Sequence, residues 1–111
     1  MRFAKAITKN IRISPRKARL AAGLIRGLNV EEAGVQLKFC RLRSGKLLQK
    51  TLDSAVANAE IKLDAKASDL RIHEVRVDAG PTMKRAKARS KGGRTPVMKR
   101  TSHFTVIVAG E

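Results

Sequence analysis

The segment from Met83 to Arg100 constrains this chain more than any other, because it is rich in cations and has no acid. Its cations are Lys84, Arg85, Lys87, Arg89, Lys91, Arg94, Lys99 and Arg100. Apolar residues alternate before it, from Leu70 to Val77, and after it, from Phe104 to Val108, as is typical of strands. Gly92-Gly93 at its middle predicts a hairpin turn with positive φ. The outer half of this hairpin has almost no apolar surface to bury, so a polyanion such as nucleic acid is expected to stabilise it.

The net charge supports the same interpretation. Lysine and arginine total 25 against nine acids in 111 residues, a formal net charge of +16. Such an excess is the electrostatic footprint of a protein that binds a phosphate backbone. An anionic membrane surface and an acidic protein partner are the rival interpretations. The chain has neither Trp nor Tyr, and its densest basic run lacks helical periodicity, so the amphipathic helix of a membrane-surface protein is not indicated.

Aromatic and cysteine usage narrow the class further. The three aromatic residues Phe3, Phe39 and Phe104 are few for a protein that stacks on single-stranded bases, which favours binding to folded or double-stranded nucleic acid. Cys40 is the single cysteine, so no disulfide, cysteine-based metal cluster or cofactor is predicted. No apolar run reaches the roughly 18 residues of a membrane span, and the first residues lack a secretory h-region. A cytoplasmic protein is therefore expected.

The length predicts a single domain, with a body of residues 1–82 and 101–111 and an arm of residues 83–100. Residues 3–13 are expected to form the first strand. Its apolar face would hold Phe3, Ile7, Ile11 and Ile13. In the second strand the apolar parity changes near His73-Glu74, which predicts a β-bulge.

Three helices are expected between the first two strands. Ser14-Pro15 supplies an N-cap and a first helical residue, and Gly27 supplies a C-terminal stop. The apolar face of this helix would hold Leu20, Ala21, Leu24, Ile25 and Leu28. A second helix is expected to begin at Asn29, and a third to run from Ser44 or Gly45 to about Lys62.

The opposite face of the first helix is basic. Arg16, Arg19 and Arg26 surround Gly23 at spacings of three and four residues, so this face is expected to lie against a phosphate backbone. Gly23 would remove a side chain where that backbone comes closest.

Candidates for catalysis are few. His73 and His103 could form an acid–base pair on RNA, as in an RNA-processing enzyme, but both fall in predicted strands. The acids are scattered over caps, loops and helix surfaces. No catalytic or metal-binding residue is therefore expected.

Several motifs carry a resemblance to a known family. They are Ser14-Pro15-Arg16-Lys17-Ala18-Arg19-Leu20, Leu24-Ile25-Arg26-Gly27, Ser54-Ala55-Val56-Ala57-Asn58-Ala59-Glu60, Val77-Asp78, Gly80-Pro81, Met83-Lys84-Arg85 and Lys99-Arg100-Thr101-Ser102-His103. In their order and spacing over nearly the whole chain they resemble the universal large-subunit ribosomal protein twenty-two family in its bacterial form.

That resemblance implies an α+β fold, with three helices packed on a small three-stranded antiparallel sheet and a long basic β-hairpin that protrudes. It implies a non-enzymatic structural protein of the large ribosomal subunit that binds large-subunit ribosomal RNA and aids subunit assembly. Such a protein would be a monomer within the ribosome, beside neighbouring large-subunit ribosomal proteins. The hairpin would reach the wall of the peptide exit tunnel, where its tip would lie near the nascent peptide.

The charge pattern and the resemblance together predict a set of RNA-binding residues. They are Lys9, Arg16, Lys17, Arg19, Arg26, Lys84, Arg85, Lys87, Arg89, Lys91, Arg94, Lys99, Arg100 and His103. The resemblance places near the tunnel Met83, Lys84, Arg85, Lys91, Gly92, Gly93 and Arg94. The alternative function is an architectural protein that embraces duplex DNA with a basic arm, although the tip lacks the apolar wedge that such proteins use.

Overall fold

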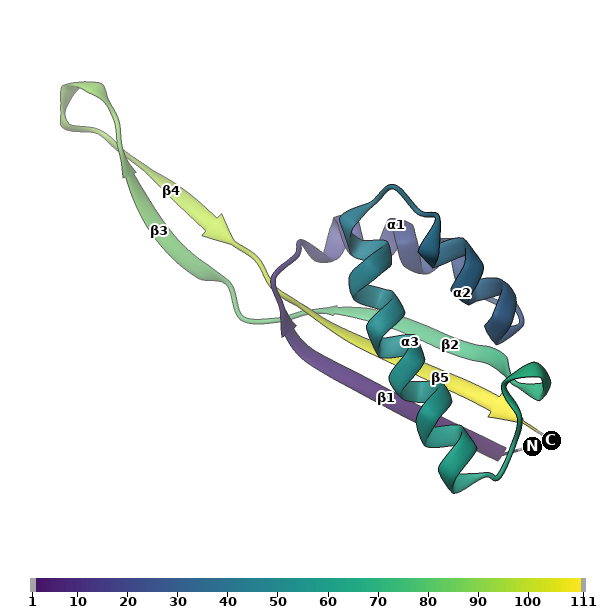
Figure 1. Cartoon of the computed structure of the whole chain (residues 1–111). Coiled ribbons are helices and arrows are strands. Elements are labelled where there is room, and N and C mark those ends of the chain that lie inside the picture. The colour runs from purple at the N-terminus through teal and green to yellow at the C-terminus, as the bar shows by residue number, and fades with distance from the viewer. Residues whose placement is uncertain (1, 111) are drawn as a thin grey trace.

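The computed structural model describes residues 2–110, and Figure 1 shows how its elements are arranged. The strands are β1 (Arg2–Ile11), β2 (Arg71–Ala79), β3 (Met83–Ala88), β4 (Arg94–Lys99) and β5 (Ser102–Gly110). The α-helices are α1 (Pro15–Ile25), α2 (Val30–Lys38) and α3 (Arg43–Lys62), and one-turn 3-10 helices lie at Ala67–Asp69 and Ser90–Gly92. Strands β1, β5 and β2 form one sheet, and β3 and β4 form a separate hairpin. This arrangement confirms the predicted α+β fold.

The sheet of the body has β5 at its centre, antiparallel to both neighbours. The register places Ala4, Val108 and Ile72 in one row across the three strands. Between Ile72 and Glu74 the register of β2 against β5 shifts by one residue, which confirms the predicted β-bulge.

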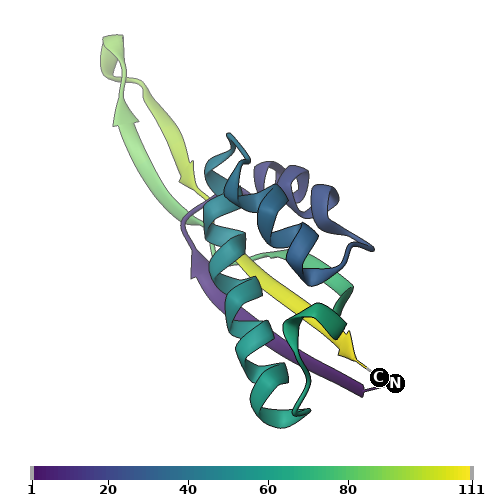
Figure 2. The same ribbon diagram turned by 45° about the vertical axis from the view of Figure 1, so that its right-hand side comes forward.

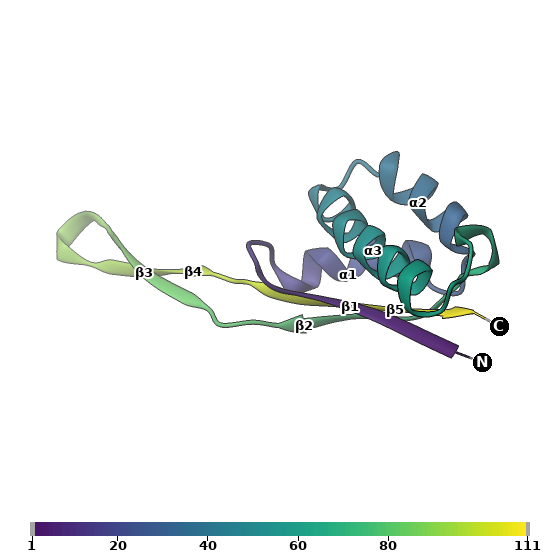
Figure 3. The same cartoon turned by 60° about the horizontal axis from the view of Figure 1, so that its bottom comes forward.

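All three helices lie on one face of this sheet, and in Figure 3 no other element of residues 2–110 covers the second face. The central strand supplies Phe104, Val106 and Val108 to the core, each without exposed surface. Arg2 and Gly110, the first and last described residues, pair at the end of the sheet away from the arm (Figures 1 and 2). Within residues 2–110 no helix combines the length and the apolarity needed to cross a membrane.

The predicted apolar face of the first strand is wrong at Phe3 and Ile7, whereas Ile13, just beyond β1, is buried and Ile11 packs against the core. Phe3 and Ile7 are 44% and 49% exposed, whereas the intervening Ala4 and Ala6 are buried. Strand β1 lies at the edge of the sheet, where α3 packs directly on it. Alanines fit beneath a closely packed helix, so the larger residues of this strand lie on the uncovered face.

Hydrogen bonds hold α3 close to β1. The hydroxyl oxygens of Thr8 and Thr51 are 2.9 Å apart, and Asn58 Nδ2 donates to the carbonyl oxygen of Lys5 at 3.0 Å. The helix therefore bonds both to a side chain and to the backbone of the edge strand, which fixes the short distance between them.

The buried side of α1 also differs from the prediction. Its buried residues are Pro15, Ala18, Ala21, Ala22 and Ile25. Leu20 and Leu24, both predicted to be in the core, are 62% and 48% exposed. Helix α1 packs against β2, α2 and α3, and its alanine stripe allows this close approach on several sides.

The ends of the first two helices confirm most of the predicted signals. Ser14 is the N-cap of α1 and Pro15 its first residue, although the Ser14 side chain makes no capping hydrogen bond. Gly27 has a φ of +77°, the left-handed conformation that ends a helix. Asn29 caps α2, because its Oδ1 accepts a hydrogen bond from the Glu31 N–H at 2.9 Å.

The arm continues outward from β2 and β5, as Figure 2 shows. Its ladder runs from the pair Met83–Lys99 to the pair Ala88–Arg94, so it spans about 20 Å before the tip. The molecule measures 63 Å along its longest axis against 24 and 16 Å along the others. No residue between Met83 and Arg100 is buried.

The turn at the tip differs in detail from the prediction. Positive φ occurs at Lys91 (62°) and Gly92 (72°), whereas Gly93 has a φ of −71°. The ladder ends at Ala88–Arg94, so the loop is longer than a two-residue turn and closes through the Arg89 N–H, which donates to the Gly93 carbonyl at 2.7 Å. The pair with positive φ is therefore Lys91-Gly92, one residue earlier than the predicted Gly92-Gly93.

Candidate nucleic-acid interface

Positive charge is concentrated in two stretches of the chain. Residues 1–30 carry eight cations and no acid, and residues 81–110 carry another eight cations and no acid. Residues 31–80 carry nine cations with eight acids and therefore contribute little to the net charge. The fold brings the two acid-free stretches together, because β1 pairs with β5. A polyanion is therefore expected to meet the arm, β1 and α1 in preference to α2 and α3.

The register of the arm puts cations on both of its faces. Side chains alternate along each strand, so the pairing of β3 with β4 places Arg85, Lys87 and Lys99 on one face. Lys84 and Arg94 lie on the opposite face. All five side chains are exposed. A protein that rested on a flat anionic surface would need cations on one face only, so this arm suits a crevice between anionic segments.

The tip is polar and cationic. Arg89 Nε donates to Thr95 Oγ1 at 3.1 Å, which orients this guanidinium beside the loop. Lys91 is exposed at the turn. Within the described tip, residues 89–94, no side chain is apolar. An apolar wedge between base pairs, the device of architectural proteins of the DNA minor groove, is therefore not present there.

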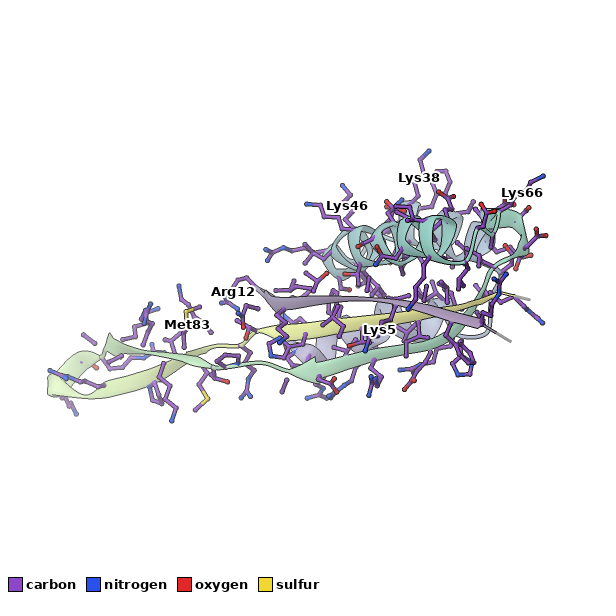
Figure 4. The ribbon with its side chains drawn as sticks, turned by 90° about the horizontal axis from the view of Figure 1, so that it is seen from below. Lys5, Arg12, Lys38, Lys46, Lys66 and Met83 are labelled. Carbon is purple, nitrogen blue, oxygen red and sulfur yellow. The ribbon has the colours of Figure 1, made fainter. Side chains whose placement is uncertain are left out.

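Hydrogen bonds fix the root of the arm to the body. Arg12 Nη1 donates to the Arg100 carbonyl at 2.7 Å, and Figure 4 shows Arg12 where β1 ends beside the arm. The Gly80 N–H donates to the Thr101 carbonyl at 2.9 Å, and the Thr101 hydroxyl donates to the Pro81 carbonyl at 2.7 Å. A Cβ at Gly80 would lie 2.5 Å from Thr101 Oγ1, so a larger residue there would displace this hydroxyl and its hydrogen bond to Pro81. The direction of the arm is therefore set at its base.

The two histidines lie apart. His103 is half-buried at the root, where its Nδ1 accepts a hydrogen bond from the Asn10 N–H at 3.1 Å. The neutral ring then carries its proton on Nε2, which leaves one donor for a phosphate. His73 packs against Phe3 with ring centroids 4.6 Å apart. It lies in the bulge opposite Ile107, about 13 Å along β5 from His103, so the two do not form an acid–base pair.

Within residues 2–110, no group of three His, Cys, Asp or Glu side chains is placed to hold a metal ion. The cysteine, Cys40, is a half-buried free thiol at the end of α2.

Two of the predicted RNA-binding residues, one on α1 and one at its C-cap, also hold the fold together. Arg19 donates to the Val77 carbonyl through Nε at 3.3 Å and through Nη2 at 3.1 Å. Arg26 Nη2 donates to the Val75 carbonyl at 3.2 Å. These carbonyls belong to β2, an edge strand, so the two guanidinium groups cover part of an open edge. No sequence pattern indicated this role, because it depends on where α1 lies beside β2.

Arg19→Ala is expected to lower the free energy of unfolding by about 1 kcal/mol, because it removes both hydrogen bonds to Val77. Arg16→Ala is the matched control: Arg16 is exposed on the same helix, and its change should stay within about 0.5 kcal/mol. Urea denaturation of the free protein measures both values. Equal stabilities of the two variants would contradict a structural role for Arg19.

The structure also adds cations that the sequence analysis missed. Arg12 and Arg43 face the same groove as Lys17 and Arg100, both of which were predicted. The run Arg41-Leu42-Arg43 was a signal, but its place beside the arm follows only from the fold. Of the remaining predicted residues, Lys9 and Arg16 are exposed, near the end of β1 and the start of α1.

Comparison with known proteins agrees with the fold and the charge distribution. Residues 6–109 match the family model described as "Ribosomal protein L22p/L17e". The chain is 69% identical over 109 residues to "Large ribosomal subunit protein uL22" of Protochlamydia amoebophila, and the match covers 98% of each chain. It is 61% identical over 104 residues to the protein of the same name from Chlamydia abortus and 59% identical to that from Chlamydia pneumoniae, with 94% of each chain covered in both cases. The chain therefore belongs to the ribosomal protein L22p/L17e family.

Proposed function

We propose that this protein is a structural constituent of the large ribosomal subunit that binds large-subunit ribosomal RNA. The observation that carries the proposal is the arm, a hairpin with cations on both faces and no acid or buried residue between Met83 and Arg100. The relatives named as large ribosomal subunit proteins match this chain over nearly its whole length, arm included. The protein would accordingly be associated with ribosomes in the cytoplasm and would have no enzymatic role.

The arm acts as an extended counterion of defined shape. Phosphates of separate RNA segments repel one another, and cations placed between them on both faces of a thin hairpin lower that repulsion. The root hydrogen bonds aim the arm, and the exposed cations of α1, Arg16 and Lys17, anchor the body beside it. In this way one small protein would hold converging RNA segments together and aid assembly of the subunit.

The family resemblance extends this proposal to the peptide exit tunnel. We place the segment Met83–Arg85 and the tip, from Lys91 to Arg94, at the tunnel wall near the nascent peptide. Helix α2 and the part of α3 beyond its first turn would be left for solvent and for neighbouring large-subunit ribosomal proteins. A single copy of residues 1–111 would act as one domain, with residues 83–100 as its extension.

Competition between nucleic acids tests the proposal. The full chain is titrated with deproteinised large-subunit ribosomal RNA in the presence of excess duplex DNA, at several salt concentrations. The affinity for ribosomal RNA is expected to exceed that for duplex DNA by at least a hundredfold and to fall steeply with salt. Equal affinity for duplex DNA would favour the architectural alternative, and an affinity that ignores salt would exclude the proposed mechanism.

Substitution of two glycines tests the contact of α1 with RNA. A Cβ at Gly23 or at Gly34 meets no atom within 4 Å, so alanine at either position should stabilise the free protein by about 0.5–1 kcal/mol. Gly23→Ala should nevertheless weaken RNA binding about tenfold, because the new methyl group separates the helix backbone from a phosphate. Gly34→Ala, on α2, should bind as the wild type does. Identical affinities for the two variants, measured by filter binding, would exclude a close backbone contact at Gly23.

A further inference from the structure

A groove of about 830 Å³ lies where the arm meets the body. It is bounded by the loop before α1, by α1, by the start of α3 and by the end of β4. Four cations line it, namely Arg12, Lys17, Arg43 and Arg100, and none of its described lining residues is an acid. Its volume falls within the range of about 300–1,000 Å³ that is usual for sites that hold a small molecule.

The groove also has an apolar part. Leu20 from α1, Leu42 from the residue before α3 and Met98 from the arm line it, and they are 62%, 40% and 47% exposed. These three residues come from separate elements, and together with the cations they make one concave surface that is half apolar and half cationic. A ligand that matches it has an apolar part joined to an anionic part.

Two helices begin at this groove and add to its positive potential. Ser14, the N-cap of α1, and Leu42, the N-cap of α3, both line it. Neither cap side chain bonds to its helix, and neither helix has an acid in its first turn. Helix α2 differs, since Glu31 and Glu32 occupy its first turn. The partial positive charges at the starts of α1 and α3 are therefore uncompensated on the side where the cations gather.

We propose that this groove holds a single unpaired nucleotide of the RNA, with its base against Leu20 and Met98 and its phosphate between Lys17 and Arg43. The proposal rests on the proposed function, because it assumes that RNA runs along the arm. The cations of the arm continue outward from Arg100 on both faces of the hairpin, so the occupant of the groove would belong to the same RNA that runs along the arm. A duplex presents its bases in a stack and cannot place one base against a separate apolar wall, so the nucleotide is extruded.

Photo-crosslinking tests the identity of the occupant. A diazirine amino acid replaces Met98 in one version of the full chain and Val35, which is 56% exposed on α2, in another. Each is bound to deproteinised large-subunit ribosomal RNA and separately assembled into large subunits. Position 98 is expected to crosslink to the base of one unpaired nucleotide in both samples, and position 35 to no RNA. Crosslinks from position 98 to paired nucleotides, or to a protein in the subunit, would overturn the proposal.

Matched variants distinguish the contribution of the base to RNA affinity from that of the phosphate. Leu20→Ala with Met98→Ala is expected to weaken binding to that RNA about tenfold and to leave its salt dependence unchanged. Leu24→Ala with Val35→Ala removes equally exposed apolar side chains elsewhere and should leave the affinity as it is. Lys17→Gln with Arg43→Gln removes the contacts to one phosphate of an unpaired nucleotide and should reduce the slope of log K against log salt by about 0.7.

Melting temperatures equal to that of the wild type confirm that all these variants are folded, since every substituted side chain is at least partly exposed. Wild-type affinity of the Leu20/Met98 variant overturns the nucleotide site alone, while the steep salt dependence of the wild type would still support the proposed function. A wild-type protein whose RNA affinity does not depend on salt overturns both.

Discussion

Replacing the four lysines of the arm with glutamine is expected to weaken binding to large-subunit ribosomal RNA by about 10³-fold at 0.15 M salt. The substituted residues are Lys84, Lys87, Lys91 and Lys99. Each phosphate contact on duplex contributes about 0.9 to the slope of log K against log salt, so losing four contacts should reduce that slope by about 3.6. Glutamine keeps the length and polarity of the side chain, and none of the four residues is buried, so the body should remain as stable as before.

A control of equal charge makes this result specific to the arm. Lys46, Lys50, Lys62 and Lys66 lie on α3 and in the loop after it, and their replacement by glutamine removes the same four charges. Figure 4 shows Lys46 and Lys66 near the two ends of the helical layer, outside the arm. This control is expected to lower the salt slope by less than about 1, because the proposed interface does not include these lysines. Affinities at 50, 100 and 200 mM salt measure both slopes, and equal losses would show that only net charge matters.

The elements of this fold were predictable because their signals are local. Ser14-Pro15 and Gly27 mark the ends of a helix through backbone conformations that few other residues supply. The change of apolar parity near His73 predicted the bulge, because one extra residue in a strand moves the apolar positions from odd to even or the reverse. The arm was predictable because a stretch with eight cations, no acid and few large apolar residues cannot belong to a core.

The buried faces were less predictable, because they depend on the distances between elements. In β1 the larger residues Phe3 and Ile7 marked the expected face, but α3 lies so close that only Ala4 and Ala6 fit beneath it. In α1 the leucines likewise gave way to alanines. Apolar periodicity gives weight to large residues, whereas a tightly packed layer of helix on sheet selects small ones. The sequence therefore predicted where these elements begin and end better than how they are rotated.

The candidate site was predictable in outline only. The cations of the arm could be identified from the sequence alone, because residues that are close in the sequence of a hairpin are also close in space. The double role of Arg19, which bonds to Val77 while it stays partly open to solvent, depends on the position of α1 beside the edge of β2. The groove between α1, α3 and the arm combines residues nearly ninety positions apart, such as Arg12 and Arg100, so no local pattern could indicate it.

Amide hydrogen exchange is expected to divide the free protein into two parts. The amides of residues 84–99 should show protection factors below about 10, whereas those of Phe104 and Val106 in the central strand should approach the limit set by global unfolding. The reason is that the arm has no buried residue, and an isolated two-stranded ladder is marginal in water. Repulsion among its eight cations disfavours it further, because no acid in the segment offsets them.

Binding to deproteinised large-subunit ribosomal RNA should raise the protection of the arm by at least about 10³-fold, since phosphates on both faces would convert that repulsion into attraction. Raising the salt to 1 M without RNA provides the control. It shortens the screening length to about 3 Å and should restore only part of the protection, because screening removes repulsion but supplies no contact. Protection in the free arm as strong as that of β5 would mean that the ladder is stable by itself. The RNA would then bind a hairpin that is already formed instead of stabilising one that is not.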